Sequence, residues 1–167
     1  MNRRPGYLHL PILAVLVILQ TTLFRFIQIQ GAAPDLVLIF LVFAAHARGP
    51  WEGQIFGFAS GFLEDLLSLA PFGFNCLVRT VTGYLMGLTR GKIFFDPLVI
   101  PVIMITAITL FRQVLMLLIS LMFLKTGTGF FGVEFWIELG MNVVLAPLIF
   151  NLFRKLGFFN DSERDIL

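Results

Sequence analysis

Continuous apolar runs, broken at proline, glycine and charged residues, make up most of this 167-residue chain. Because the runs do not alternate in polarity, they favour helices over a membrane β-barrel. A membrane-spanning helix takes about 20 residues, so the chain has room for six spans with short connections. We expect one all-α, polytopic transmembrane domain with spans at about 8–24, 33–47, 51–69, 74–89, 98–124 and 133–153, and a polar tail at 160–167.

The second of these segments is the shortest, since its charge-free core covers only residues 36–47. A segment of that length is also compatible with a tilted or re-entrant helix. We prefer six spans because they place the basic residues asymmetrically, as the positive-inside rule requires. Only Arg25 and Lys125 then lie outside, and both termini are cytoplasmic. The inner side collects Arg3, Arg4, Arg48, Arg90, Lys92, Arg154, Lys155 and Arg164.

The N-terminal segment has a competing interpretation as a cleaved signal peptide, because Arg3 and Arg4 precede the apolar run at 8–24 and Gly31-Ala32-Ala33 resembles a cleavage site. Signal peptides have apolar cores of about 7–15 residues, and this run is longer. Arg25 also lies before the possible cleavage site. We therefore expect an uncleaved first helix.

Composition supports a membrane protein and excludes several other classes. Hydrophobic residues account for 58% of the chain and charged residues for 13%, and the mean hydropathy is +0.93. That charge content is about half of the usual ~25% and cannot cover the surface of a soluble enzyme. The basic residues form no stripe for nucleic acid, Cys76 is the only cysteine, and the spacing of His and Cys predicts no metal site or cofactor.

The sequence gives no support for catalysis. Ser60-Gly61 resembles part of the nucleophile turn of an intramembrane serine protease, but no histidine follows His46 to act as its base. We expect His9 and His46 to be polar residues near the membrane surfaces. The adjacent Glu64 and Asp65 point to different faces of a helix, so they form a poor acid–base pair.

Glycines recur every fourth residue in the third and fourth segments, which a short turn joins. The third segment has Gly53, Gly57 and Gly61, followed by Asp65, and the fourth has Arg79, followed by Gly83, Gly87 and Gly91. Small residues at this spacing allow close approach of helices in lipid. Glycine is also simply common in membrane helices. We expect the two glycine faces to pack together.

Each glycine face carries one charged residue toward the outer end of its segment. Opposite charges at similar depth on neighbouring helices can pair and avoid isolated burial. We therefore predict an ion pair between Asp65 and Arg79, with Glu64 as the alternative partner of Arg79.

Arg112 is the most costly residue in the sequence because it lies in the middle of the fifth apolar segment. Insertion of arginine at such a depth costs about 2.5–3.5 kcal/mol. Glu138 in the sixth segment is the expected counter-ion. A structural ion pair is the favoured interpretation, and a ligand or proton site is the alternative.

Several stretches, in this order and spacing, resemble the MreD family of bacterial rod shape-determining membrane proteins. Pro34, Asp35, Gly73, Asn142 and Pro147 are the positions that we associate with the family pattern. The stretches are Ala33–Leu38, Gly57–Ser68, Gly73, Gly83–Leu85, Phe135–Trp136, Asn142, Pro147 and Phe153–Lys155. Two features depart from the pattern: Glu64 stands beside Asp65, and Arg79 is not part of it.

The resemblance implies a non-catalytic component of the elongasome in the bacterial cytoplasmic (inner) membrane. Such proteins bind MreC, a bitopic membrane protein, and through it connect MreB filaments to the peptidoglycan polymerase RodA and its transpeptidase partner. The implied fold resembles the substrate-binding components of energy-coupling-factor transporters. A vitamin-like ligand in a cavity lined by Arg112, Glu138 and Asn142 is therefore the second functional hypothesis, and Pro147 is expected to bend the sixth helix.

Overall fold

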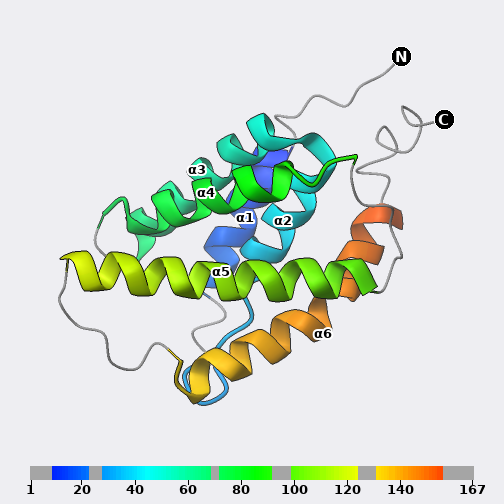
Figure 1. Ribbon diagram of the computed structural model, residues 1–167. Helices are drawn as coiled ribbons and strands as arrows, with labels where there is room; N and C mark the ends of the chain where they lie inside the picture. The colour runs from blue at the N-terminus through cyan, green and yellow to red at the C-terminus, as the bar shows by residue number, and fades with distance from the viewer. Residues whose placement is uncertain (1–8, 23–27, 69–71, 92–98, 124–130, 156–167) are drawn as a thin grey trace.

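The computed structural model describes residues 9–22, 28–68, 72–91, 99–123 and 131–155, and the described part is all-helical. Its six helices agree closely with the six predicted apolar segments. They are α1 (His9–Thr22), α2 (Leu36–Arg48), α3 (Pro50–Leu67), α4 (Phe74–Gly87), α5 (Val99–Phe123) and α6 (Val133–Lys155). Figure 1 shows α1 to α4 gathered on one side of the long helix α5, with α6 crossing beneath it. The predicted polar tail at 160–167 lies outside the described residues.

Helix α2 forms the centre of the bundle and contacts each of the other five helices. Every residue from Val37 to Ala47 is buried. A helix that is apolar on all sides is stable only when neighbours surround it, and this sequence is apolar around its whole circumference. Its 13 residues are about 20 Å long at 1.5 Å per residue, so α2 is shorter than the helices around it.

The turn between α2 and α3 is built from Gly49 and Pro50. Gly49 has φ of 104°, a value that residues with a Cβ rarely adopt, and its N–H donates to the Ala45 carbonyl at 2.7 Å. Pro50 occupies the first turn of α3, where its missing N–H has no cost. The chain therefore reverses within two residues, and α3 returns alongside α2.

Glycines bring α3 and α4 into direct backbone contact. A Cβ on Gly57 would overlap the carbonyl oxygen of Arg79, and one on Gly53 would overlap the carbonyl oxygen of Gly83. Gly61 faces Asn75 and Cys76 in the same way. The two helices run side by side in Figure 1, and their backbones are closer than residues with a Cβ would allow.

Gly87 extends this close contact to the other end of α4, where a Cβ would overlap the backbone of Pro50. Gly91, the last glycine of the predicted face, follows α4 and has open space around its Cβ position. The close packing therefore runs from Gly61 at one end to Gly87 at the other.

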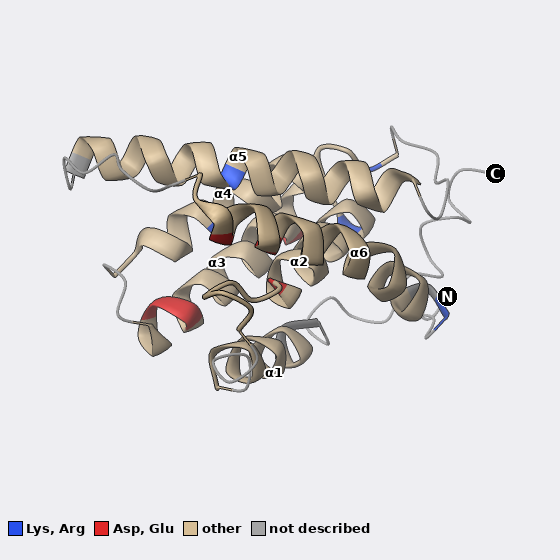
Figure 2. Ribbon diagram, turned by 90° about the horizontal axis from the view of Figure 1, so that it is seen from below, with Lys and Arg blue, Asp and Glu red and all other residues tan. Residues whose placement is uncertain are grey.

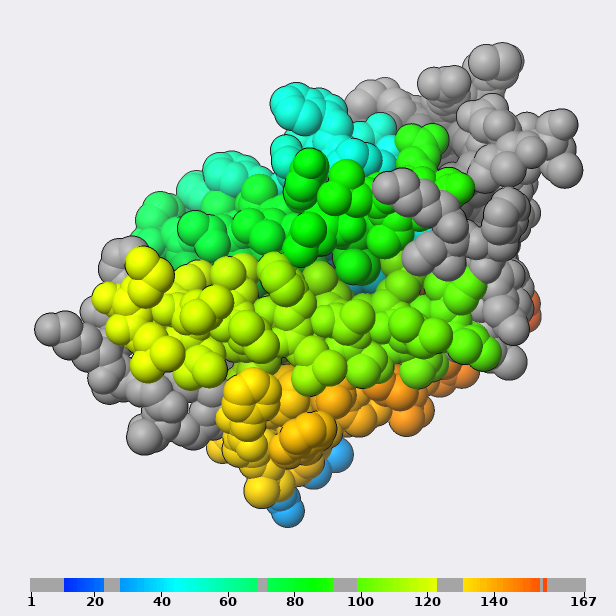
Figure 3. Space-filling view, viewed as in Figure 1, coloured from blue at the N-terminus to red at the C-terminus, as the bar shows by residue number. Residues whose placement is uncertain are grey.

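Helices α5 and α6 are the two described helices that are long and apolar enough to cross a membrane, with candidate spans at Val99–Met122 and Val133–Phe153. One face of each packs against α2 through a core that includes Ile105, Ile108, Ala146 and Phe150. In Figure 3, large parts of both helices lie on the open surface of the bundle. The exposed side chains of α5 are apolar and include Ile103, Leu118 and Met122.

Helix α6 contains Pro147 and bends along its length in Figure 1. A proline inside a helix removes one backbone hydrogen bond and commonly produces such a bend. Ala146 and Phe150, on either side of Pro147, are buried against α2. The bend accompanies the packing of α6 against the central helix.

Candidate functional site

Asp35 lies at the N-terminus of the central helix, and most of the polar contacts inside the bundle involve it. It follows the buried Pro34, and its side chain accepts a hydrogen bond from the Leu38 N–H at 2.9 Å, which caps α2. The residue is only 3% exposed. A buried carboxylate needs compensating donors or cations, and the helix N-terminus supplies only part of this compensation.

Two arginines from different helices supply the rest. The Nη2 atom of Arg79, on α4, lies 3.2 and 3.3 Å from the two carboxylate oxygens of Asp35. The Nη1 atom of Arg112, on α5, donates to Oδ2 of Asp35 at 2.5 Å. One carboxylate is therefore shared between two guanidinium groups.

Each arginine also binds a second carboxylate, from the helix next to its own. The Nε atom of Arg79 donates to Glu64 of α3, and the Nη2 atom of Arg112 donates to Glu138 of α6. The side chains of Glu64 and Glu138 are each 21% exposed, whereas that of Asp35 is 4% exposed. The five charged groups thus form one chain that is buried at its centre and partly open at both ends.

Two neutral amides complete the set. The side chain of Gln20, on α1, donates to Asp35 Oδ1 at 3.0 Å and accepts from the Val37 N–H at 3.0 Å. The side-chain oxygen of Asn142, on α6, accepts from the Asp35 N–H at 2.8 Å. Each of the six helices therefore contributes at least one side chain to what we call the polar network. Its members are Gln20, Asp35, Glu64, Arg79, Arg112, Glu138 and Asn142.

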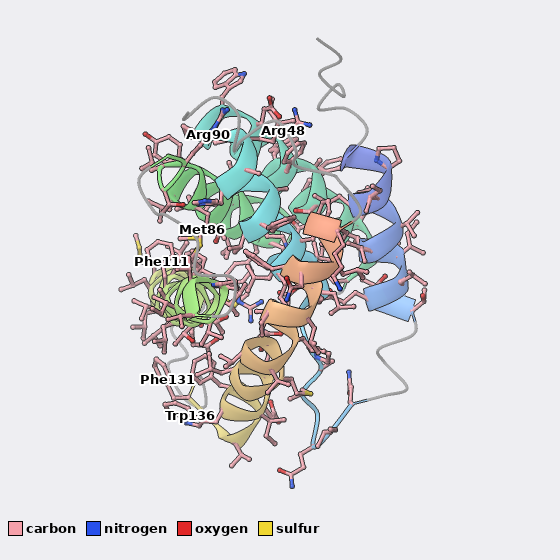
Figure 4. All side chains as sticks on the ribbon, turned by 90° about the vertical axis from the view of Figure 1, so that its right-hand side faces the viewer. Arg48, Met86, Arg90, Phe111, Phe131 and Trp136 are labelled. Carbon is pink, nitrogen blue, oxygen red and sulfur yellow. The ribbon has the colours of Figure 1, made fainter. Side chains whose placement is uncertain are left out.

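The network is surrounded by apolar side chains. Figure 2 shows that charged residues occupy few positions along the helices, and Figure 4, with α5 seen close to end-on, shows nitrogen-bearing side chains between α5 and the other helices. In Figure 4, Met86 of α4 and Phe111 of α5 lie on the sides of these helices that face one another. Both pack against the apolar core formed by α2, α5 and α6.

Removal of one member of a buried ion pair costs about 3–5 kcal/mol, because the other charge is left uncompensated.

The predicted pair between Asp65 and Arg79 does not occur in the structure. Asp65 is buried, and its carboxylate accepts hydrogen bonds from three backbone N–H groups at the start of α4. The donors are Gly73 at 2.9 Å, Cys76 at 3.0 Å and Asn75 at 3.1 Å. These groups have no partner within α4 itself, so a carboxylate from α3 caps the next helix.

Glu64, the alternative partner in the prediction, does bind Arg79, together with Asp35. Depth and helix face favour an Asp65–Arg79 pair, but the backbone N–H groups at the start of α4 compete for the Asp65 carboxylate. Gly73 makes the cap possible, because its φ of 91° lets the chain turn sharply before α4 begins. Arg112 and Glu138, by contrast, are paired as predicted.

The cap leads to a testable prediction about Asp65. We expect Asp65→Ala to lower the stability of the protein by about 0.5–2 kcal/mol, the usual cost of removing a helix cap. Asp65→Asn retains one side-chain oxygen as an acceptor and should lose less. Thermal unfolding of the purified variants in detergent measures both effects, and equal stability of Asp65→Ala and the unchanged protein would contradict the capping role.

Two features of the polar network were not predicted from the sequence: the binding of Asp35 to both arginines, and the hydrogen bonds of Gln20. From the sequence, Asp35 is recognisable only as a family-pattern position at the start of the second segment. Gln20 follows a long apolar run in helix α1, and a polar residue in a membrane helix often marks an internal contact. Of the other family-pattern positions, Pro34 is buried next to Asp35 and Gly73 forms the turn before α4. Asn142 binds the Asp35 N–H, and Pro147 lies within α6.

The end of the bundle at the α2–α3 turn has its own polar contacts. His46 is buried, and its Nδ1 atom lies 2.6 Å from the Thr89 hydroxyl. The Nη1 atom of Arg90 donates to the Arg48 carbonyl at 2.6 Å, and the two arginines lie close together in Figure 4. His46 is therefore part of the packing between α2 and the end of α4, and the side chain of His9 lies outside the described residues.

These features define an all-helical bundle with an apolar exterior, two helices long enough to cross a membrane, and a central network of charges. The protein-family model for the rod shape-determining protein MreD matches residues 2–156, and the chain therefore belongs to the MreD family. MreD proteins are membrane proteins that take part in determining the rod shape of bacterial cells. No curated protein and no solved structure matches the chain.

Proposed function

We propose that this protein is a non-catalytic, multi-pass component of the cell-elongation complex in the bacterial inner membrane. In this role it binds an MreC-like bitopic protein and contributes to the control of peptidoglycan synthesis. The observation that carries the proposal is the match to the MreD family over residues 2–156, almost the whole chain. The indirect partners are MreB filaments, RodA and the transpeptidase that acts with RodA.

Helix directions support a six-span arrangement as part of this proposal. In Figure 1 the ends of α3 and α5 and the start of α6 lie toward one side, whereas the α2–α3 turn and the end of α6 lie toward the other. The second side has Arg48, Arg90 and Lys155, and it is the cytoplasmic side by the positive-inside rule. Both termini are cytoplasmic in this arrangement.

The surface of the bundle supports a partner that binds laterally, within the membrane. Exposed apolar side chains lie along α3, α5 and α6, including Phe58, Leu118 and Leu148. The described residues between helices form only short connections. A protein of this kind offers helix surfaces to its partner, and a single membrane helix of an MreC-like protein has matching chemistry.

The vitamin-binding alternative, with a fold like that of energy-coupling-factor substrate-binding components, has less support. Arg112, Glu138 and Asn142 do come together, as that hypothesis predicted. Arg112 and Glu138, however, bind each other, and Arg112 and Asn142 also bind Asp35. Most of the polar atoms expected to hold a ligand therefore have protein partners, and the two that lack one, Nε of Arg112 and Nδ2 of Asn142, are buried.

Deletion of the gene, with re-expression from a plasmid, tests the proposed function. We expect cells without the protein to become round and re-expression to restore rods, and we expect the protein to co-purify with an MreC-like partner in mild detergent. Rod-shaped deletion cells would contradict the role in shape, and purification without any MreC-like protein would contradict the proposed partner. Photo-crosslinkers at Phe58, Leu118 and Leu148 would then identify the helix that contacts the partner.

A further inference from the structure

Three buried N–H groups around Asp35 have no acceptor among the described residues. They are Nη1 of Arg79, Nε of Arg112 and Nδ2 of Asn142. Each belongs to a side chain that is already in direct contact with Asp35, through its carboxylate or its backbone N–H. Buried donors of this kind are uncommon, because each unpaired polar group costs about 1–3 kcal/mol.

Two hydroxyl groups extend this set along α4 and α5. Thr82 lies three residues after Arg79, and Thr109 lies three residues before Arg112, so each is one helical turn from its arginine. Both threonines are fully buried, and neither hydroxyl has a partner in the described part of the chain. Both also lie on the same side of the arginines, toward the end of α4 and the start of α5.

The chemistry of these groups restricts what can bind to them. A metal ion does not match them, because the three nitrogen groups are hydrogen-bond donors. A further anion does not match either, because three carboxylates already face two guanidinium groups in the network. A large organic molecule would need an open route to atoms that are buried, and the remaining candidate is small, neutral and able to accept hydrogen bonds.

We propose that the bundle binds internal water molecules at this position, between Asp35, the two arginines, Asn142 and the two threonines. Buried water typically makes about three hydrogen bonds to polar groups that would otherwise be unpaired. Glu64 and Glu138, the partly exposed ends of the network, give this site a polar connection to the surface. The inference does not depend on which partner the bundle binds.

Solid-state NMR of the full-length protein in lipid bilayers tests the site with water itself as the probe. We expect magnetisation from water to reach the Arg112 Nε–H and the Asn142 side-chain amide within a mixing time that also labels the exposed Arg90. The backbone amide of Ile105, two turns from Arg112 in the apolar core, should stay unlabelled. Transfer to neither polar group, or equal transfer to Ile105, would overturn the proposal.

Conservative variants of the two threonines give a second, independent measurement. Valine has the shape of threonine without the hydroxyl, so Thr82→Val and Thr109→Val remove one hydrogen-bonding group each. If the hydroxyls bind water, both variants should lower Tm; a higher Tm in both would show unpaired hydroxyls in a dry site and would overturn the proposal. Thr80→Val is the matched control. The Thr80 hydroxyl donates to the Cys76 carbonyl of its own helix, so this variant removes a hydroxyl that already has a protein partner.

Discussion

Replacement of Asp35 by asparagine is expected to prevent stable accumulation of the protein in the membrane. The substitution keeps the size of the side chain but removes the negative charge that Arg79 and Arg112 share. Glu64 and Glu138 still face the two arginines, but each arginine loses its most deeply buried partner. Breaking a buried ion pair costs about 3–5 kcal/mol, and here one change breaks two of them. That amount approaches the whole stability of many proteins, about 5–15 kcal/mol. Immunoblots of membrane fractions and Tm in detergent measure the loss.

A matched control for Asp35→Asn is Glu134→Gln, which removes a carboxylate from the exposed first turn of α6. Exposed charges contribute about 0–1 kcal/mol, so this variant should accumulate normally. If Asp35→Asn and Glu134→Gln accumulate to the same level, Asp35 does not have the structural importance that its contacts indicate.

Substitution of Gly57 by alanine is expected to have the second-largest effect. The added Cβ would overlap the backbone of Arg79 and Thr80, so α3 and α4 would have to move apart. Overpacking usually costs about 1–3 kcal/mol, and the cost here should be at or above the upper end because backbone cannot move aside as a side chain can. The separation would also displace Arg79, so both Tm and the cell shape of a complemented deletion strain should be affected.

Gly140 provides the matched control for Gly57 because it is exposed on α6 and has open space where a Cβ would be. Alanine is favoured over glycine inside helices by about 1 kcal/mol, so Gly140→Ala should be neutral or slightly stabilising. Equal effects of Gly57→Ala and Gly140→Ala would mean that close contact between α3 and α4 is not required.

The positions of the helices could be predicted well from the sequence, because apolar runs and their proline, glycine and charged boundaries are local features. The predicted segment at 98–124 and the observed helix Val99–Phe123 differ by one residue at each end. Close packing of α3 on α4 was also predictable, since glycine at every fourth position on two adjacent helices gives each a flat face.

The network could be predicted only in part, because its contacts join residues far apart in the chain. The pair of Arg112 and Glu138 could be predicted from the free-energy cost of burying Arg112 and from the depth of the two residues. The position of Asp35 between Arg79 and Arg112, however, depends on the central position of α2. No local pattern shows that α2 is surrounded by five helices. Asp65 was assigned to the wrong partner because the backbone N–H groups at the start of α4 compete for its carboxylate.

The most direct test of the account is a double-mutant cycle of Arg79→Gln and Arg112→Gln, measured as unfolding free energy in lipid–detergent micelles. The two arginines are connected through Asp35, which keeps one cation when either arginine is lost and none when both are lost. We therefore predict that the double variant loses more than the sum of the single losses, with a coupling between about 0.5 and 3 kcal/mol. Additive losses, to within about 0.3–0.5 kcal/mol, would show that the arginines act independently and would contradict a single network centred on Asp35.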